Sequence, residues 1–289
     1  MIFKELGKTG LKVSEIGLGT EYLFDQPKDV VESVILNAIE NEINYFDVLF
    51  SVTNYIGKMA SILRKYRDDI IITGHIGATE LNSRPKRTRS IKESKIAFSR
   101  LLNLLKIDYV DIINIQFVKM NEYENMIKPG GLMELAISIQ EEGKAKYLGL
   151  STHDTSVAEQ AIKTGKFDTI MFPINLVNHG LPGRSELMKN CNKNNIGLIA
   201  IKPFAAGRLL IQNRTVNFAK YQTGGISLKR KIPKELTSSQ CINYVNSLNG
   251  VSVVLAGVKS VDELRENLKY SNPQERKRDF SSMIEFFQE

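Results

Sequence analysis

The sequence contains no tryptophan, three histidines and two cysteines among its 289 residues. Cys191 and Cys241 lie 50 residues apart and form no CxxC pair, which argues against a disulfide framework or zinc knuckle and fits a reducing cytoplasm. No apolar run reaches the roughly 18 residues that span a membrane, and the opening residues MIFKELGKTG contain no apolar signal segment. We therefore expect a cytoplasmic protein that does not engage a membrane.

The composition is that of a globular chain with a large core. Hydrophobic residues make up 42% and charged residues 25% of the sequence, which argues against disorder. The length exceeds that of an average domain but is normal for a single α/β barrel. We therefore expect one domain over residues 1–289.

Positive charge exceeds negative charge, with a net charge of +7. Basic runs occur at Arg84–Arg89 (RPKRTR) and Lys229–Lys231 (KRK), without aromatic interleaving or a nucleic-acid-binding module. Because basic surfaces also attract small anions, the runs favour solvated surface or an anionic cofactor or substrate over a nucleic-acid partner.

Eight short apolar runs alternate with stretches of helical periodicity, which predicts a (β/α)8 TIM barrel. A turn signal at Gly7–Gly10 predicts an N-terminal β-hairpin that closes the barrel bottom. A doubly wound sheet is the rival, but GLGTEY (17–22) lacks the third glycine of a dinucleotide fingerprint. The expected strands are 15–19, 44–48, 69–73, 109–115, 147–151, 169–173, 197–203 and 251–257, and the expected helices are 30–40, 91–105, 132–142, 156–163, 185–194, 238–248 and 261–270.

Barrel chemistry takes place where strands end and the following loops begin. Candidate residues, nearly all polar, stand at or just after the ends of all eight expected strands, and His179 follows strand six. The set is Glu21, Asp47, His75, Gln116, Ser151, Thr152, His153, Asn175, Lys202, Gly257, Lys259 and Ser260.

The order of motifs resembles the aldo/keto reductase family over roughly residues 3–270. The resemblance is carried by LGKTGLKVSEIGLGT (6–20), GKAKYLGLST (143–152), IGLIAIKPFAAGRLL (196–210) and LAGVKSVDELREN (255–267). Further motifs are similar to a divergent branch, many of whose members carry a cysteine-rich, iron–sulfur-like C-terminal tail. Here the last residues, DFSSMIEFFQE, contain no cysteine.

The resemblance implies NAD(P)H-dependent hydride transfer to a carbonyl, with a catalytic tetrad of Asp, Tyr, Lys and His. Asp47 matches the Asp. The family Tyr follows five residues later, where this chain has Val52, and Tyr55 matches only if the loop is rebuilt. His75 stands in place of the Lys and Gln116 in place of the His. A cation is needed because a tyrosine of pKa about 10 is otherwise a poor acid at neutral pH.

The resemblance also implies a cofactor site, with NADP(H) preferred because of Lys259 and NAD(H) as the alternative. Ser151 and Thr152 would hold the carboxamide, the glycine loop the pyrophosphate, and the start of the last major helix the 2′-phosphate and adenine. The implied cofactor-binding residues are Ser151, Thr152, Phe204, Ala206, Gly207, Leu209, Gly257, Lys259, Ser260, Glu263 and Asn267.

Three functional classes stay open. In the first, catalysis survives with Asp47, Tyr55, His75 and Gln116, and acts on a small-molecule substrate. In the second, a non-catalytic nucleotide-binding or sensing barrel remains. In the third, Glu21, Asp47, His75 and His153 bind a metal for hydrolase or isomerase chemistry, without a tight ligand spacing to support it. The substrate pocket would be formed by 117–128 and 210–233, and neither the substrate nor the oligomeric state follows from the sequence.

Overall fold

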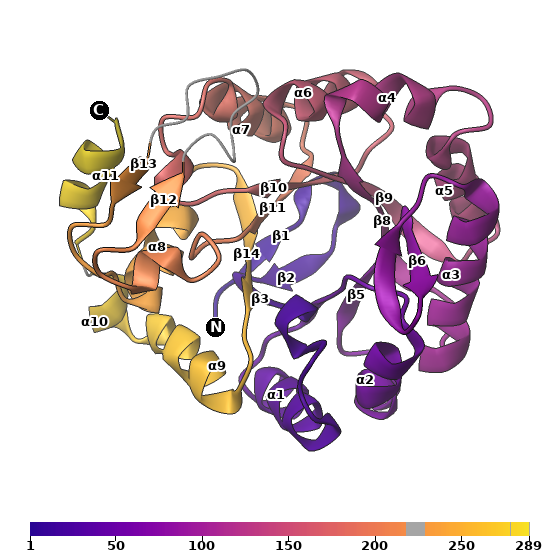
Figure 1. Ribbon diagram of the computed structural model, residues 1–289, viewed down its shortest axis with the longest axis horizontal. Helices are drawn as coiled ribbons and strands as arrows, with labels where there is room; N and C mark the ends of the chain where they lie inside the picture. Colours follow the sequence, from indigo (N-terminus) through magenta and orange to yellow (C-terminus); the bar gives the residue numbers. More distant parts are fainter. Residues whose placement is uncertain (218–228, 278, 289) are drawn as a thin grey trace.

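A computed structural model of the chain describes residues 1–217, 229–277 and 279–288. Eight parallel strands form a closed barrel in the order β10-β11-β14-β3-β4-β5-β8-β9, and the helices surround it (Figure 1). The predicted TIM barrel is therefore confirmed. Its strands are β3 (Ile16–Gly19), β4 (Tyr45–Val48), β5 (Ile71–Ile76), β8 (Val110–Val118), β9 (Ala145–Thr152), β10 (Thr169–Pro173), β11 (Gly197–Ile201) and β14 (Val251–Gly257).

Three of these strands run further than the apolar runs indicate. β5 extends to Ile76, β8 to Val118 and β9 to Thr152, because pairing continues past the apolar runs. His75 pairs with Asn114, and Val118 pairs with Thr152 after an irregularity in the ladder that contains Gln116. His75 and Gln116 therefore lie within strands, not after them as the sequence indicated. β11 instead ends at Ile201, before Lys202, whose φ of 58° is incompatible with a strand.

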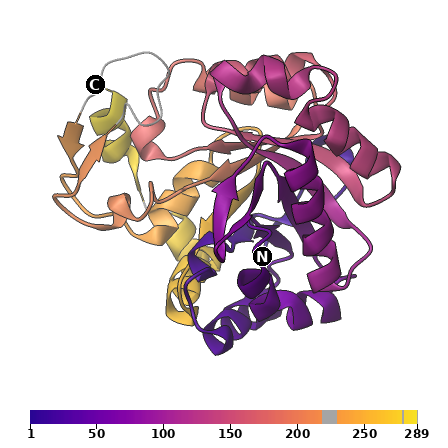
Figure 2. The ribbon, with the colours of Figure 1, turned by 45° about the vertical axis from the view of Figure 1, so that its right-hand side comes forward.

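The seven helices expected from the apolar periodicity are confirmed as α1, α3, α5, α6, α7, α8 and α9, with ends that differ by at most two residues. Figures 1 and 2 show α9 beside α1, so the C-terminal part of the ring closes against its first helix. The helices are α1 (Lys28–Glu40), α2 (Thr53–Lys65), α3 (Ile91–Leu105), α4 (Met120–Ile127), α5 (Leu132–Glu141), α6 (Thr155–Lys163), α7 (Arg184–Lys193), α8 (Ser238–Asn246), α9 (Val261–Leu268), α10 (Pro273–Arg276) and α11 (Ser281–Gln288). Within the part of the chain that the structure describes, none of the helices has the length and apolarity to cross a membrane.

The N-terminal hairpin of β1 (Phe3–Glu5) and β2 (Lys12–Ser14) closes one end of the barrel. Its Leu6 and Val13 pack into the barrel interior with residues from six of the strands. The turn comes close to the start of β11, where Lys8 N donates to Asn195 O at 2.6 Å. A Cβ on Gly7 would lie 2.2 Å from Gly197 N, so the fit of the hairpin requires glycine there.

Two further hairpins project from the barrel. β6 (Ala78–Leu81) and β7 (Arg84–Arg87) pair through a turn in which Asn82 and Ser83 have positive φ, as a type I′ turn requires. The basic run 84–89 therefore includes a strand, which the sequence analysis had not identified. β12 (Thr215–Asn217) pairs with β13 (Lys229–Lys231), and part of the expected substrate loop 210–233 lies outside the described residues.

The close approach of the hairpin turn to β11 predicts unequal costs for two glycine substitutions. Gly7 and Gly10 both have positive φ, but a Cβ on Gly10 would meet nothing within 4 Å. Gly10→Ala should therefore lower the free energy of unfolding by about 1 kcal/mol, the cost of left-handed backbone. Gly7→Ala should cost about 3 kcal/mol, because overpacking is added. Denaturant unfolding measures both, and equal losses would contradict the tight packing of Gly7 against Gly197.

Candidate active site

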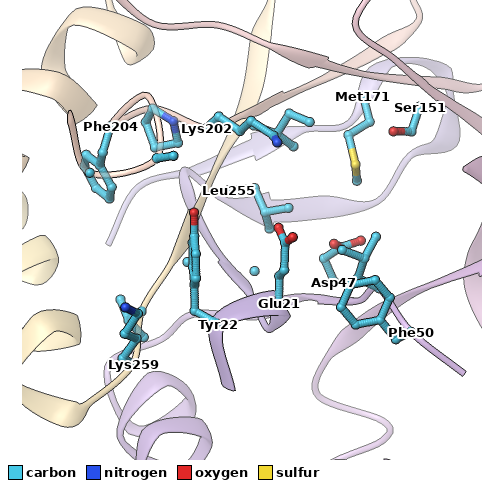
Figure 3. Close-up of a pocket in the computed structure, with 18 of the residues that line it drawn as sticks. Glu21, Tyr22, Asp47, Phe50, Ser151, Met171, Lys202, Phe204, Leu255 and Lys259 are labelled. Carbon is cyan, nitrogen blue, oxygen red and sulfur yellow. The ribbon is translucent and has the colours of Figure 1, made fainter. Parts of the chain in front are cut away.

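A cavity of about 580 Å³ crosses the mouth of the barrel at the carboxyl ends of the strands, a size typical of ligand sites. One end is formed by loops after β11 and β14, and the other by residues from β8 and the β6–β7 hairpin. β14 and β8 lie on opposite sides of the closed barrel. Figure 3 shows Phe204 and Lys259 at one end and Asp47, Phe50 and Ser151 toward the other.

Asp47 and His75 form a hydrogen-bonded pair below the cavity. Both are almost fully buried, and His75 Nε2 lies 2.6 Å from Asp47 Oδ1. An ionised carboxylate only accepts hydrogen bonds, so Nε2 is the donor in this pair. Asp47 lines the cavity, whereas His75 does not. His75 can therefore act on a bound molecule only through Asp47.

Tyr55 lies on α2 and does not line the cavity. Its side chain is 1% exposed, and its hydroxyl bonds to Thr20 Oγ1, which donates to Asp47 O at 2.6 Å. Burial, outweighing the hydrogen bond with Thr20, raises the pKa of Tyr55 far above its ordinary value. The geometry gives Tyr55 no path to a ligand, so its role as proton donor is not supported. Phe50, in the segment between β4 and α2, lines the cavity instead.

Gln116 lines the cavity near the carboxyl end of β8. The next residue, Phe117, has a φ of 46° and also faces the cavity. Arg89 Nη2 donates to the carbonyls of Gln116 and Phe117 at 2.9 and 3.0 Å. This side-chain clamp holds the bent backbone and thereby fixes where the Gln116 amide is presented.

The two residues expected at the carboxamide have different surroundings. Ser151 lines the cavity beside Met171, as Figure 3 shows. Thr152 points away: its hydroxyl donates to Val118 O at 2.8 Å and accepts from Asp154 N at 3.0 Å. Ser151 is therefore available to a ligand, while Thr152 fixes the turn into α6.

The loop after β11 has positive φ at Lys202, Ala205, Ala206 and Gly207. Phe204, Ala206 and Gly207 line the cavity, so backbone groups approach it closely. Leu209 is fully buried in the core and anchors the loop without facing a ligand. Such a run of turns can cradle an anion with backbone N–H groups.

The start of α9 forms the cavity wall next to this loop, with Gly257, Lys259, Glu263 and Asn267. Ser260 caps the helix and accepts from Glu263 N at 3.3 Å, so it does not face the cavity. The Glu263 carboxylate accepts from Lys259 N at 2.7 Å. A negative charge therefore occupies part of the helix start that was expected to meet a 2′-phosphate.

The metal alternative receives no support from the geometry. Of Glu21, Asp47, His75 and His153, the structure pairs Asp47 with His75. Within residues 1–217, 229–277 and 279–288, no group of three or more His, Cys, Asp or Glu side chains could hold a metal ion.

The sequence analysis missed several cavity residues, among them Tyr22, Phe50 and Arg87. Tyr22 and Phe50 each follow a barrel strand by two or three residues, so extending the search slightly past each strand end would have found candidates there. Arg87 comes from an inserted hairpin, for which the basic run was the available signal.

The comparisons with known proteins agree with this architecture. A family model described as the Aldo/keto reductase family matches residues 15–286. An uncharacterized oxidoreductase of Bacillus subtilis, YqkF, is 24% identical over 93% of this chain and 90% of its own. L-galactose dehydrogenase of Arabidopsis thaliana is 22% identical over 92% and 86%.

A solved structure has the same fold. The aldo-keto reductase AKR11C1 from Bacillus halodurans, in its holo form, superposes with a TM-score of 0.77 at 18% identity, covering 100% of this chain and 95% of its own.

The buried hydroxyl of Tyr55 predicts a loss of stability in Tyr55→Phe. Removing it breaks the contact with Thr20, which should cost about 1–2 kcal/mol of unfolding free energy. Tyr123 is the matched control, because it is also 2% exposed or less but its hydroxyl has no hydrogen-bond partner among the described residues. Tyr123→Phe should therefore cost close to nothing. Denaturant unfolding compares the two, and an equal effect would show that the Thr20 contact contributes no stability.

Proposed function

Since the chain belongs to the aldo/keto reductase family, we propose that it is an NAD(P)H-dependent oxidoreductase that transfers a hydride to or from a carbonyl or alcohol of a small molecule. The observation that carries this proposal is the Asp47–His75 pair under a cavity that crosses the barrel mouth. The cavity extends from the loops after β11 and β14, which would hold the cofactor phosphates, to the polar end of β8 on the other side of the barrel.

The residues present fit a dinucleotide. The backbone of Phe204–Gly207 would hold the pyrophosphate and Ser151 the carboxamide. Lys259, just before α9, and Asn267 on α9 would hold the adenosine end. When bound, the nicotinamide supplies or accepts the hydride. The protein's own contribution is to orient the two reactants and to handle the proton.

We assign the proton transfer to the Asp47–His75 pair. In the reducing direction, His75 starts as an imidazolium and passes its Nε2 proton to the Asp47 carboxylate, which gives a proton to the developing alkoxide. Asp47 is again a carboxylate at the end, and His75 is a neutral imidazole with its remaining proton on Nδ1. Gln116 has two amide donors and lines the same cavity, so it can hydrogen-bond the carbonyl oxygen. This assignment gives His75 an indirect role, because burial separates it from the cavity.

The pair predicts a loss of turnover without loss of nucleotide binding. Asp47→Asn and His75→Gln should each lower kcat about 100-fold or more with an aldehyde panel, as removal of a general acid does. The rise in Tm on addition of NAD(P)H should stay close to that of the unsubstituted protein, because neither residue contacts the phosphate-binding loops.

Tyr55→Phe is the control, and it should keep most of the activity because its hydroxyl points away from the cavity. The opposite pattern, with Tyr55→Phe inactive and His75→Gln active, would overturn the assignment.

The burial of Tyr55 away from the cavity also favours the second candidate function, a nucleotide-binding or sensing barrel. Nucleotide binding without turnover of any aldehyde would support that candidate.

The preference between NADP(H) and NAD(H) depends on opposing charges at α9. Lys259 favours a 2′-phosphate, but the carboxylates of Glu263 and Glu266 line the same part of the cavity. Glu263 is held toward the helix start by its bond to Lys259 N. We propose that Glu263 offsets Lys259 and that the chain uses both cofactors.

Removing the charge of Glu263 should shift the preference toward NADPH. A unit charge a few ångströms from a phosphate near the surface contributes about 1–2 kcal/mol, so Glu263→Gln should raise the ratio of NADPH to NADH affinity about tenfold. Asp262→Asn is the control on the same helical turn, since its side chain is 92% exposed and pairs with Arg265. Fluorescence titration of the reduced cofactors gives both ratios. An unchanged ratio in Glu263→Gln would exclude this role.

A further inference from the structure

Two arginines share one carboxylate at the β8 end of the cavity. Arg87, the last residue of β7, and Arg89 both bond to the carboxylate of Glu122, in the first turn of α4. We call Arg87, Arg89 and Glu122 the arginine cluster. Its formal charge is +1, because two guanidinium groups face one carboxylate. Burial and the neighbouring Arg89 lower the pKa of Arg87, as expected for two adjacent cations.

Arg87 is the member of the cluster that lines the cavity. Its Nη2 donates to Glu122 and, at 3.0 Å, to the carbonyl of Phe117. A guanidinium has five N–H donors, and those on Nε and Nη1 of Arg87 have no acceptor among the described residues. The side chain is 38% exposed. Arg87 is thus fixed at one nitrogen and offers its other donors to a ligand.

The arginine cluster is adjacent to Gln116, the residue proposed to hydrogen-bond the substrate carbonyl. The guanidinium of Arg87 lies 5.4 Å from the ring centre of Phe117, the residue that follows Gln116. Arg89 holds the carbonyl of Gln116 itself at 2.9 Å. A molecule whose carbonyl reaches Gln116 and Asp47 would therefore extend past the Phe117 ring toward Arg87.

The charges of the cavity differ between its two ends. The end formed after β3, after β11 and along α9 carries three carboxylates and two lysines, namely Glu21, Glu263, Glu266, Lys202 and Lys259. Arg87 lies across the barrel, beside β8, and the carboxylate that it pairs with, Glu122, is shared with Arg89. Three carboxylates against two lysines leave no positive surplus at the end assigned to the cofactor phosphates. The surplus of the arginine cluster lies at the β8 end, where Asp47 is the carboxylate that lines the cavity.

We propose that the substrate of this chain is a carbonyl compound with a carboxylate, and that Arg87 binds that carboxylate while the carbonyl lies at Gln116 and Asp47. The inference rests on the proposed reductase function. A single carboxylate neutralises the surplus charge of the cluster, and its bonds to a guanidinium are charge-assisted and stronger than those between neutral groups. Phe117 gives the intervening part of the substrate an apolar surface.

The test compares a negatively charged aldehyde with an uncharged analogue. 4-Carboxybenzaldehyde and its methyl ester present the same ring and carbonyl, but only the acid has a charge. With NAD(P)H, kcat/KM for the acid should exceed that for the ester by about tenfold or more, since one charge-assisted bond contributes about 1.5–3 kcal/mol. Arg87→Gln should remove this advantage, chiefly by raising KM for the acid, and Arg87→Lys should restore part of it.

Arg84→Gln is the matched control on the same strand, because its side chain is 65% exposed, pairs with Asp25 and does not line the cavity. It should leave the ratio of acid to ester unchanged. Equal kcat/KM for acid and ester in the unsubstituted protein would overturn the inference. So would an equal loss for both substrates in Arg87→Gln, which would mark Arg87 as structural.

A binding measurement separates failure of this inference from failure of the proposed function. If nucleotide binds but no aldehyde is reduced, benzoate should still quench the fluorescence of bound NAD(P)H more strongly than benzamide, and Arg87→Gln should abolish the difference. If neither NADH nor NADPH binds, the proposed function fails. The effects of benzoate and benzamide on the Tm of the unsubstituted protein and of Arg87→Gln are then compared instead. The absence of an Arg87-dependent preference for benzoate in that measurement refutes the carboxylate site.

Discussion

The hydrogen bond between His75 and Asp47 is the interaction on which the site depends. It joins β4 to β5 inside the barrel, where both side chains are almost completely withdrawn from water. An isolated carboxylate there would be costly, and the imidazole N–H compensates for its lost hydration. The chain from Tyr55 through Thr20 to the carbonyl of Asp47 then ties α2 and the end of β3 to the same residue. The end of β3, α2 and β5 are thus all tied to Asp47 on β4.

Most of the fold could be predicted because its parallel strands are covered on both faces. Such strands are nearly continuous apolar runs, and all eight were identified, although the ends of β5, β8 and β9 were placed too early. Those ends contain polar residues: His75 continues the ladder beneath the cavity, and Gln116 lies at an irregularity of the ladder and lines the cavity. Hydrophobicity alone therefore ends a strand where the functional side chains begin. The β6–β7 hairpin was missed for a related reason, since β7 is largely exposed and basic.

The candidate site was harder to predict than the fold. The sequence places Asp47, Gln116 and Ser151 at strand ends, and the structure places all three on the cavity wall. The sequence could not show on which face of α2 Tyr55 would lie, because a rebuilt loop changes the helical phase of the residues after it. It also could not show that Glu263 turns back to the helix start, since that contact depends on the cap formed by Ser260.

Backbone strain at the two ends of the cavity indicates how the site is held ready for ligands. Phe117 at one end, and Lys202, Ala205 and Ala206 at the other, have positive φ without being glycine, at about 1 kcal/mol or more each. Neighbouring groups stabilise each strained segment: Arg89 binds the carbonyl of Phe117, and Asn175 Nδ2 donates to that of Lys202 at 2.9 Å.

These stabilising contacts come from the scaffold and not from a ligand. Arg89 is in turn neutralised by Glu122, and the loop after β11 is anchored by the buried side chain of Leu209. The conformational cost of shaping both ends is therefore met during folding, so binding a dinucleotide and a substrate would require little further ordering of the backbone. The arginine cluster combines both roles: Arg89 shapes the β8 end of the cavity, and Arg87, held by the same carboxylate, provides its charge.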